Sequence, residues 1–464
     1  MSIYSSLDRS IQASDTVVRF QQALVDCGFQ GAVRTERAAR VLNATDNSIY
    51  YREPACVLEP QNAAGVVAAV KAAAASGLSI TARGGGTGTN GQSLTDGVVL
   101  DTSRFMNQIL EFSAQSQTVR VQPGVVLDQL NAYLKPFGYF FPPTVSTSSR
   151  ATLGGMVATD ASGKGSRIYG RTSDYVLSAQ VVLSDGSKAT IEDLPAQAEP
   201  PTGPLGKAVD LLRSELPLLS DEIEKVFPAI NRGLSGYNLD QLRGPDGTLR
   251  LTKLLAGSEG TLAVTTELTL RVTRLPQCRG IAIIGYADSL IALSAVADLL
   301  VADPEAIEFL DDKTVQLGKS TPAWPLLEAA LGADLSACGG YLFAEVSDDS
   351  AEGVARQLDR LKVATGQSSI AAVGLVATQD AELMGALKSL RKDAVGLMGK
   401  GSGALTSANG TFNVDLDFNN ITQYGTAFSV TELDQDGYRP GQFIGLKINE
   451  NGVVTGQYSN GQTR

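Results

Sequence analysis

The stretch best suited to chemistry is a glycine-rich loop at residues 81–91, which reads TARGGGTGTNG. Its glycines remove the side chains that would keep a ligand away from the backbone. Successive N–H groups in such a loop form a concave anion site suited to a pyrophosphate. Four further residues could add one positive charge and three polar groups: Arg83, Thr87, Thr89 and Asn90. A flexible turn between two strands also fits the loop taken alone.

The loop also matches the glycine fingerprint of dinucleotide-binding Rossmann folds. Gly86, Gly88 and Gly91 have the required spacing, and Glu111 stands about where the ribose-binding acid would be. A Rossmann fold requires a helix directly after the glycines. Residues 92–97 instead predict a turn that leads into another strand, so the context excludes the Rossmann interpretation.

The chain of 464 residues contains no histidine. This absence excludes Ser-His-Asp and Cys-His catalysis, HExxH metal sites and histidyl-linked cofactors. Any general base must be Asp, Glu, Lys, Tyr or a thiolate. The four cysteines form no CxxC pair, which favours reduced thiols in a cytoplasmic protein and no metal site.

The amino-acid composition limits the classes of protein to which this chain can belong. A net charge of −11 argues against nucleic acid or an anionic membrane as the main partner. The apolar fraction of 43% is typical of a soluble globular protein, and the length predicts two or three domains. No apolar run reaches membrane-spanning length, and the N-terminus lacks the pattern of a signal peptide.

The elements around the loop follow from hydrophobic periodicity. Residues 1–50 predict an amphipathic helical extension. Residues 62–75 predict a helix closed by Gly77, and strands are predicted on both sides of the glycine loop. Strand-like and helix-like segments alternate over residues 279–375, which indicates a compact α+β second domain.

Two further clusters of small residues occur later in the chain, at residues 151–163 and 254–264. Each would let backbone approach a flat or anionic ligand closely. For the cluster at 151–163, a tight helix–strand contact explains the small residues equally well. Neither cluster is a nucleotide P-loop or a GxSxG nucleophile elbow.

These constellations, in this order, resemble the flavoproteins with a vanillyl-alcohol-oxidase-type (PCMH) FAD-binding domain. The resemblance covers about residues 15–400, and several motifs in register make it more specific than a lone glycine loop. Residues 46–50, 137–143 and 146–155 are most similar to the long bacterial D-2-hydroxyglutarate dehydrogenases.

The resemblance implies an α+β fold: a two-subdomain PCMH-type FAD-binding domain, a truncated α+β cap domain and a short all-β C-terminal segment. Its boundaries are an N-terminal helical extension at 1–50, the FAD-binding domain at 51–276, the truncated substrate or cap domain at 277–400, and a final segment at 401–464.

The resemblance also implies non-covalent FAD, with its pyrophosphate on the backbone of the glycine loop. The residues expected at the cofactor are Arg83, Gly84, Gly85, Gly86, Thr87, Gly88, Thr89, Asn90, Pro143, Thr152, Leu153, Gly154, Thr159, Asp160, Gly163, Ile168, Gly260 and Val264.

The implied reaction is hydride transfer from a D-2-hydroxy acid, such as 2-hydroxyglutarate, to flavin N5, with an unknown electron acceptor. Arg391 matches the family arginine that grips a substrate carboxylate, a task suited to a guanidinium; a solvated helix charge is the alternative. The histidine motif that carries the family's base and metal ligands is missing. The catalytic residue therefore stays unassigned, and a crippled enzyme is expected.

Residues 401–464 change in character, being rich in glycine, asparagine and aromatic residues. Short strands and turns are predicted there. Segments 410–418, 423–430, 435–438 and 456–463 resemble the flagellar hook protein. The expectation is a chimera of a truncated flavin dehydrogenase and a hook fragment, which could join a filament only if the fusion is natural. A flavin-binding module without turnover and a structural hook-related protein are the alternatives.

Overall fold

The structure, a computed structural model, describes residues 15–228, 230, 236–319, 321–336 and 338–400, together with the short stretches 405–407, 410–412, 443–448 and 454–458. The chain forms two compact units that divide between Gly396 and Leu397, close to the predicted boundary at residue 400. No helix in the described ranges is long and apolar enough to cross a membrane.

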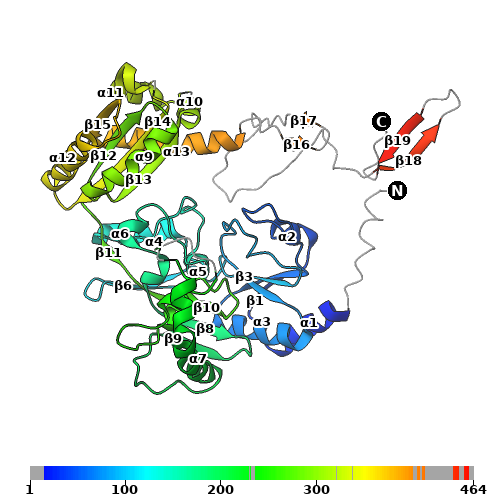
Figure 1. The fold of residues 1–464 in the computed structure, drawn as a ribbon. Helices are drawn as coiled ribbons and strands as arrows, with labels where there is room; N and C mark the ends of the chain where they lie inside the picture. The colour runs from blue at the N-terminus through cyan, green and yellow to red at the C-terminus, as the bar shows by residue number, and fades with distance from the viewer. Residues whose placement is uncertain are drawn as a thin grey trace. The chain divides into compact units, whose positions relative to one another are not determined.

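The first sheet holds the glycine loop. Its strands lie in the order β1 (Gly31–Arg34), β2 (Cys56–Pro60), β4 (Val98–Asp101), β3 (Ile80–Arg83), and the last three run parallel. Helices α1 (Asp15–Asp26) and α3 (Ala63–Ser76) share its core (Figure 1). Asn62 begins α3 by accepting a hydrogen bond from the Gly65 N–H at 3.0 Å, and Gly77 ends it in the left-handed region.

The N-terminal part departs from the predicted helical extension. After α1 the chain forms β1, which pairs antiparallel with β2, and then the short helix α2 (Arg37–Leu42). The prediction of a helix across this region was wrong because β1 gains its hydrogen bonds from a strand some 25 residues away, a partner that local periodicity cannot reveal. Residues 31–34 therefore belong to the first sheet.

The second sheet is antiparallel, with strands in the order β5 (Ile109–Ser113), β6 (Thr118–Val121), β10 (Ala263–Arg271), β8 (Val176–Leu183), β9 (Lys188–Glu192). One hydrophobic core joins it to α4 (Leu127–Leu134), α5 (Leu153–Ala158), α7 (Pro204–Val226) and α8 (Leu251–Leu255). Strand β7 (Tyr139–Phe140) pairs antiparallel with β11 (Thr273–Arg274). Strand β11 directly precedes the third sheet in the sequence.

A third sheet lies within residues 277–400, the region predicted to be the cap and called the cap below. Its antiparallel strands lie in the order β13 (Ala306–Asp311), β14 (Gly340–Asp348), β12 (Cys278–Tyr286), β15 (Gly374–Thr378). Helices α9 (Ser289–Leu299) and α12 (Ala351–Gln367) pack on one face; α10 (Asp312–Gly318), α11 (Trp324–Ser336) and α13 (Ala381–Lys400) pack on the other (Figure 1). The alternation of strands and helices predicted for this region is confirmed.

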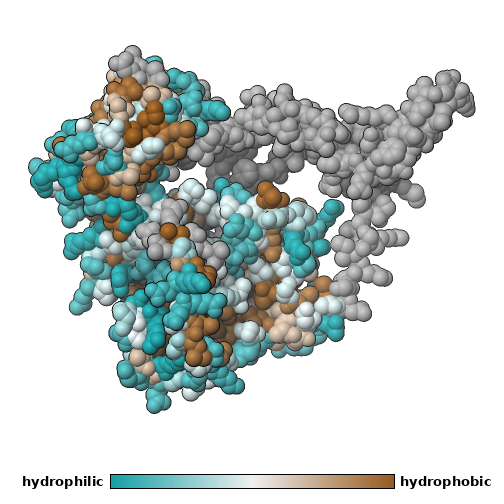
Figure 2. Space-filling model, viewed as in Figure 1, coloured by the Kyte–Doolittle hydropathy of each residue, from teal (hydrophilic) through white to brown (hydrophobic). Residues whose placement is uncertain are grey.

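The second unit is described only as two antiparallel strand pairs, β16 (Leu405–Ser407) with β17 (Gly410–Phe412) and β18 (Phe443–Ile448) with β19 (Val454–Tyr458). The predicted α+β fold class is confirmed for the chain. On the visible face of the molecule, hydrophobic residues lie in separate groups among hydrophilic ones (Figure 2), the usual surface of a globular protein.

Candidate functional site

A cavity of about 1120 Å³ lies where the glycine loop meets the two later clusters of small residues. Its walls come from residues 82–93, 144–147, 151–167 and 255–265, with the cap adding residues 305–308. Ligand pockets for drug-sized molecules measure ~300–1,000 Å³. The cavity is therefore large enough for an extended ligand together with a small second molecule.

The glycine loop packs directly against the start of the second cluster. A Cβ on Gly84 would lie 2.0 Å from Thr152 Oγ1, and one on Gly85 would lie 2.1 Å from the Arg150 carbonyl oxygen. Both distances are far below van der Waals contact. The protein itself thus requires Gly85, and it requires Gly84 as long as Thr152 keeps its place, which adds to the close ligand approach argued from the sequence.

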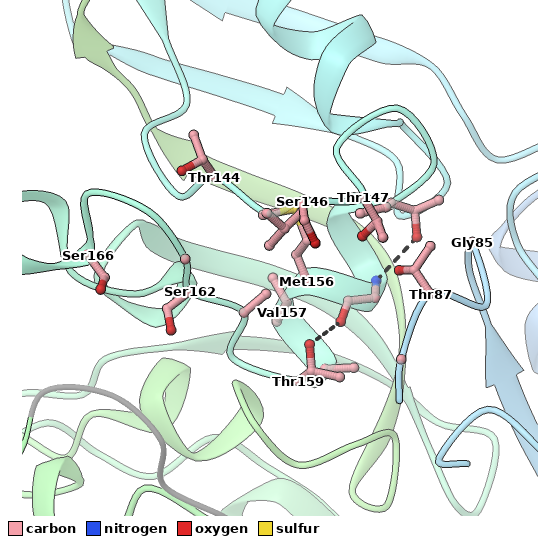
Figure 3. Close-up of a pocket in the computed structure, with 18 of the residues that line it drawn as sticks. Gly85, Thr87, Thr144, Ser146, Thr147, Met156, Val157, Thr159, Ser162 and Ser166 are labelled. Atoms are coloured by element: carbon pink, nitrogen blue, oxygen red, sulfur yellow. Dashed lines mark hydrogen bonds between the residues drawn. The ribbon is translucent and has the colours of Figure 1, made fainter. Parts of the chain in front are cut away.

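Hydroxyl groups dominate the wall that faces the loop (Figure 3). Thr152 Oγ1 accepts from the Gly155 N–H at 3.4 Å and begins α5, and Thr159 Oγ1 donates to the Gly155 carbonyl at 3.0 Å. Met156 and Val157, between these threonines, give the same wall an apolar part. The wall can therefore meet both a polar and a flat apolar ligand portion.

Arg83 supports the loop as well as lining the cavity. Its guanidinium donates to the Thr45 carbonyl at 2.7 Å and to Ser93 Oγ at 3.3 Å. Burial lowers the pKa of Arg83, and the nearby carboxylates of Asp101 and Asp46 act in the opposite direction. The guanidinium stays charged and ties the loop to the segment before β2.

Most predicted cofactor residues line this cavity. They are Arg83, Gly84, Gly85, Gly86, Thr87, Gly88, Thr89, Asn90, Thr152, Gly154, Thr159, Gly163 and Gly260. The others stand behind or beside the wall: Pro143, Leu153, Asp160, Ile168 and Val264. Leu153 is fully buried in the core and Ile168 is about half exposed. The role of each residue at a cofactor stays a prediction.

Sequence reasoning missed the charged residues that the cap contributes. Lys164 Nζ, just after the second cluster, donates to the Glu345 carboxylate and lies 3.6 Å from Glu308 Oε2. Arg279 Nη1 lies 3.5 Å from Glu305 Oε1. The available signal was a lone acid, Glu345, inside the apolar run of β14. All five side chains line the cavity.

The part of the chain with described side chains contains no group of three or more His, Cys, Asp or Glu that could hold a metal ion. The side chain of Arg391 lies outside the described residues, although its backbone belongs to α13. Lys388, one helical turn earlier, does line the cavity.

Two family models match the chain. The FAD binding domain matches residues 54–191, and the C-terminal domain of FAD linked oxidases matches residues 275–428. The first range holds the glycine loop and most of the cavity wall. The chain carries a PCMH-type FAD-binding domain followed by an FAD-linked oxidase domain. FAD is therefore its cofactor, and the FAD-linked oxidase match extends past the boundary predicted at residue 400.

Curated relatives agree with this assignment. The chain is 38% identical over 421 residues to the D-2-hydroxyglutarate dehydrogenase of Pantoea ananatis, covering 87% of this chain and 41% of the relative. It is 34% identical over 456 residues to that of Haemophilus influenzae, covering 94% and 44%. The chain thus spans about two fifths of the length of these relatives.

Solved structures show the fold. An alkyldihydroxyacetonephosphate synthase superposes with a TM-score of 0.56 at 18% identity, covering 77% of this chain and 61% of that one. A carbohydrate oxidase from Microdochium nivale gives a TM-score of 0.52 at 13% identity, covering 80% and 63%. None of these similarities supports the hook-protein resemblance of residues 401–464, which stays a prediction.

The cavity fits the flavin cofactor. The glycine loop and the first turn of α5 present backbone to it, while Met156, Val157 and Leu255 supply an apolar surface. The acidic side chains of its wall, Glu259 and the cap glutamates, lie outside the glycine loop. A diphosphate on the glycine loop would therefore meet N–H groups, hydroxyls and Arg83.

Proposed function

We propose that this FAD-linked oxidoreductase domain acts on a small D-2-hydroxy acid of the 2-hydroxyglutarate type. The observation that carries the proposal is the cavity, which joins the glycine-loop wall to a cap wall bearing several charged side chains. The similarity to D-2-hydroxyglutarate dehydrogenases over most of this chain supports the substrate class.

Arg391 is the proposed ligand for the substrate carboxylate. Lys388 lines the cavity and Arg391 follows it by three residues on α13, so the two share one face of the helix. A guanidinium binds a carboxylate through two parallel hydrogen bonds. This placement supports the role expected from the sequence.

When bound, FAD supplies the hydride acceptor for oxidation of the hydroxy carbon. The chain's own residues then bind and orient the two partners. The glycine loop and Arg83 would hold the anionic end of the cofactor, and the cap supplies a further part of the cavity wall. The hydroxyl proton still requires an acceptor, and no histidine exists in this chain to take it.

We expect binding of flavin with low turnover for this reason. Loss of a positioned general base reduces rates by roughly 10²–10⁴-fold. If the turnover falls to zero, the domain is a flavin-binding module without turnover.

The test is the visible spectrum of the purified, desalted chain before and after anaerobic addition of D-2-hydroxyglutarate. Matched additions of the L enantiomer and of D-lactate control for stereochemistry and for the second carboxylate. Slow bleaching with the D enantiomer alone supports the proposal. Flavin that stays oxidised with every acid would reduce the function to cofactor binding.

An R391M variant sharpens the test, with R360M on the exposed face of α12 as its control. R391M should raise the concentration of substrate needed for half-maximal bleaching, because the carboxylate loses its partner. If R391M and R360M reach half-maximal bleaching at the same substrate concentration, Arg391 does not bind the substrate carboxylate.

A further inference from the structure

A buried polar network lies directly behind the cavity wall. Asp160 and Arg171 form an ion pair with Oδ2 and Nη1 3.3 Å apart, and their side chains are only 7% and 5% exposed. Asn238, also buried, accepts from Arg171 Nη1 at 3.1 Å and donates to Asp160 Oδ2 at 2.9 Å. The three side chains thus satisfy one another away from water.

The same network ties together segments distant in the sequence. The Asp160 Oδ1 atom accepts from the Ser173 N–H at 2.8 Å. The Asn238 side chain also donates to the Ala256 carbonyl at 3.0 Å. Backbone contacts continue the connection, because the Gly257 N–H donates to the Val157 carbonyl at 2.9 Å. One polar cluster therefore joins the ends of the second and third small-residue clusters.

The joined segments are cavity wall. Thr159 and Ala161, the neighbours of Asp160, line the cavity, as do Ser258 and Gly260 just after the Gly257 contact. Asp160 itself has φ 44°, in the left-handed region that Asp and Asn tolerate. Its carboxylate is turned into the protein, so it holds the wall in shape without facing the cavity.

We propose that Asp160 and Arg171 are positioning residues for the flavin, which brace the cavity wall and keep it electrically neutral. The inference rests on FAD in the cavity and not on the proposed substrate. Charges so deeply buried are weakly screened. An unbalanced positive charge behind the wall favours the reduced, more negative flavin, and an unbalanced negative charge disfavours it.

The proposal predicts shifts of opposite sign. D160N leaves Arg171 unbalanced and should raise the midpoint potential of bound flavin at pH 8. R171M leaves Asp160 unbalanced and should lower that potential. The double variant D160N/R171M should return close to the wild-type potential. Both single variants should weaken FAD binding on the order of tenfold, the low end of the loss seen when residues behind metal ligands are removed.

Two further variants separate positioning from charge. N238A removes the link to Ala256 but keeps the ion pair, so FAD binding should weaken with an unchanged potential. R120M is the matched control, because Arg120 pairs with Glu267 at 2.9 Å in the same domain while being 42% exposed. It should change neither quantity.

Flavin fluorescence titration gives the dissociation constants, and equilibration with a reference dye gives the potentials. The proposal would be overturned if the midpoint potentials of D160N and R171M shifted in the same direction from the wild-type value. Shifts no larger than that of R120M would overturn it as well. If a single variant fails to fold, the double variant and N238A decide: a shifted potential in either one, or wild-type FAD affinity in N238A, would also overturn it.

Discussion

Lys164, on the loop before α6 (Ser166–Tyr169), donates its ammonium to Glu345 at the middle of the cap strand β14. The two residues are 181 positions apart in the sequence. Arg167, on α6, adds a 2.6 Å contact to Asp303 and a 3.1 Å bond from its Nε to the Pro304 carbonyl. One short segment of the FAD-binding part therefore holds the cap by several charged contacts.

Removing the lysine should loosen that contact. K164M leaves the nearly buried Glu345 without its charged donor, and an unsatisfied buried acceptor costs about 1–3 kcal/mol. The free energy of unfolding, measured by urea denaturation, should fall by that amount. K362M is the control, because the Lys362–Asp359 pair is exposed on α12 and exposed pairs contribute under about 1 kcal/mol. Equal losses in the two variants would contradict the interpretation.

Alanine at position 85 should abolish flavin retention. The added Cβ would meet the Arg150 carbonyl at 2.1 Å, so the loop must move off the cavity wall. G366A is the control, since position 366 lies in α12 with open space around it. That change should be neutral or slightly stabilising, because Ala has the higher helix propensity. Flavin that stays with G85A through gel filtration would show that the loop tolerates the shift.

Acid should weaken the fold partly through Asp174. Burial would raise the pKa of this carboxyl, but a hydrogen bond from the Arg171 N–H and the contact with Lys253 lower it below the ordinary value of 3.8. A lowered folded-state pKa adds stability above pH 3.8 that is lost as the pH falls through the folded-state value. Denaturation at pH 3 and pH 7 should therefore show a smaller acid loss in D174N than in the wild type. Identical losses would exclude this carboxyl.

The cysteines should differ sharply in reactivity. Burial raises the pKa of the Cys56 thiol to about 11, and its side chain is almost inaccessible in β2. Cys27 is exposed at the end of α1. Iodoacetamide at pH 8 should modify Cys27 in the native protein and Cys56 only after unfolding, since the thiolate is the reactive form. Mass spectrometry of the labelled peptides measures the order.

Local sequence signals predicted the local structure well. Helix α3 was predicted at residues 62–75 with Gly77 closing it, within one residue of its observed bounds at each end, because Asn62 and Gly77 act within one turn of it. The glycine loop was likewise assigned to the site from its composition. Strand β1 was missed because its stability comes from β2, a pairing that no pattern within residues 31–34 encodes.

The rest of the site depends on contacts between distant segments. No sequence pattern near residue 164 predicts its contact with Glu345, and none near residue 160 predicts its contact with Asn238. Both contacts exist because separate sheets bring those strands and loops to one cavity. Sequence reasoning therefore found the wall built from small residues and missed the charged cap and the buried network behind the wall.

Two glycines of the same loop face different evolutionary constraints. At Gly88, the atoms nearest to an added Cβ belong to the side chain of Gln92, at 2.8 Å, and a change at position 92 can remove that obstacle. At Gly85 the obstacle is a backbone carbonyl, which no substitution deletes. Position 88 can therefore accept a residue with a side chain when position 92 is substituted as well. Position 85 has no such partner, and descendants of this sequence should keep its glycine even where the ligand has changed.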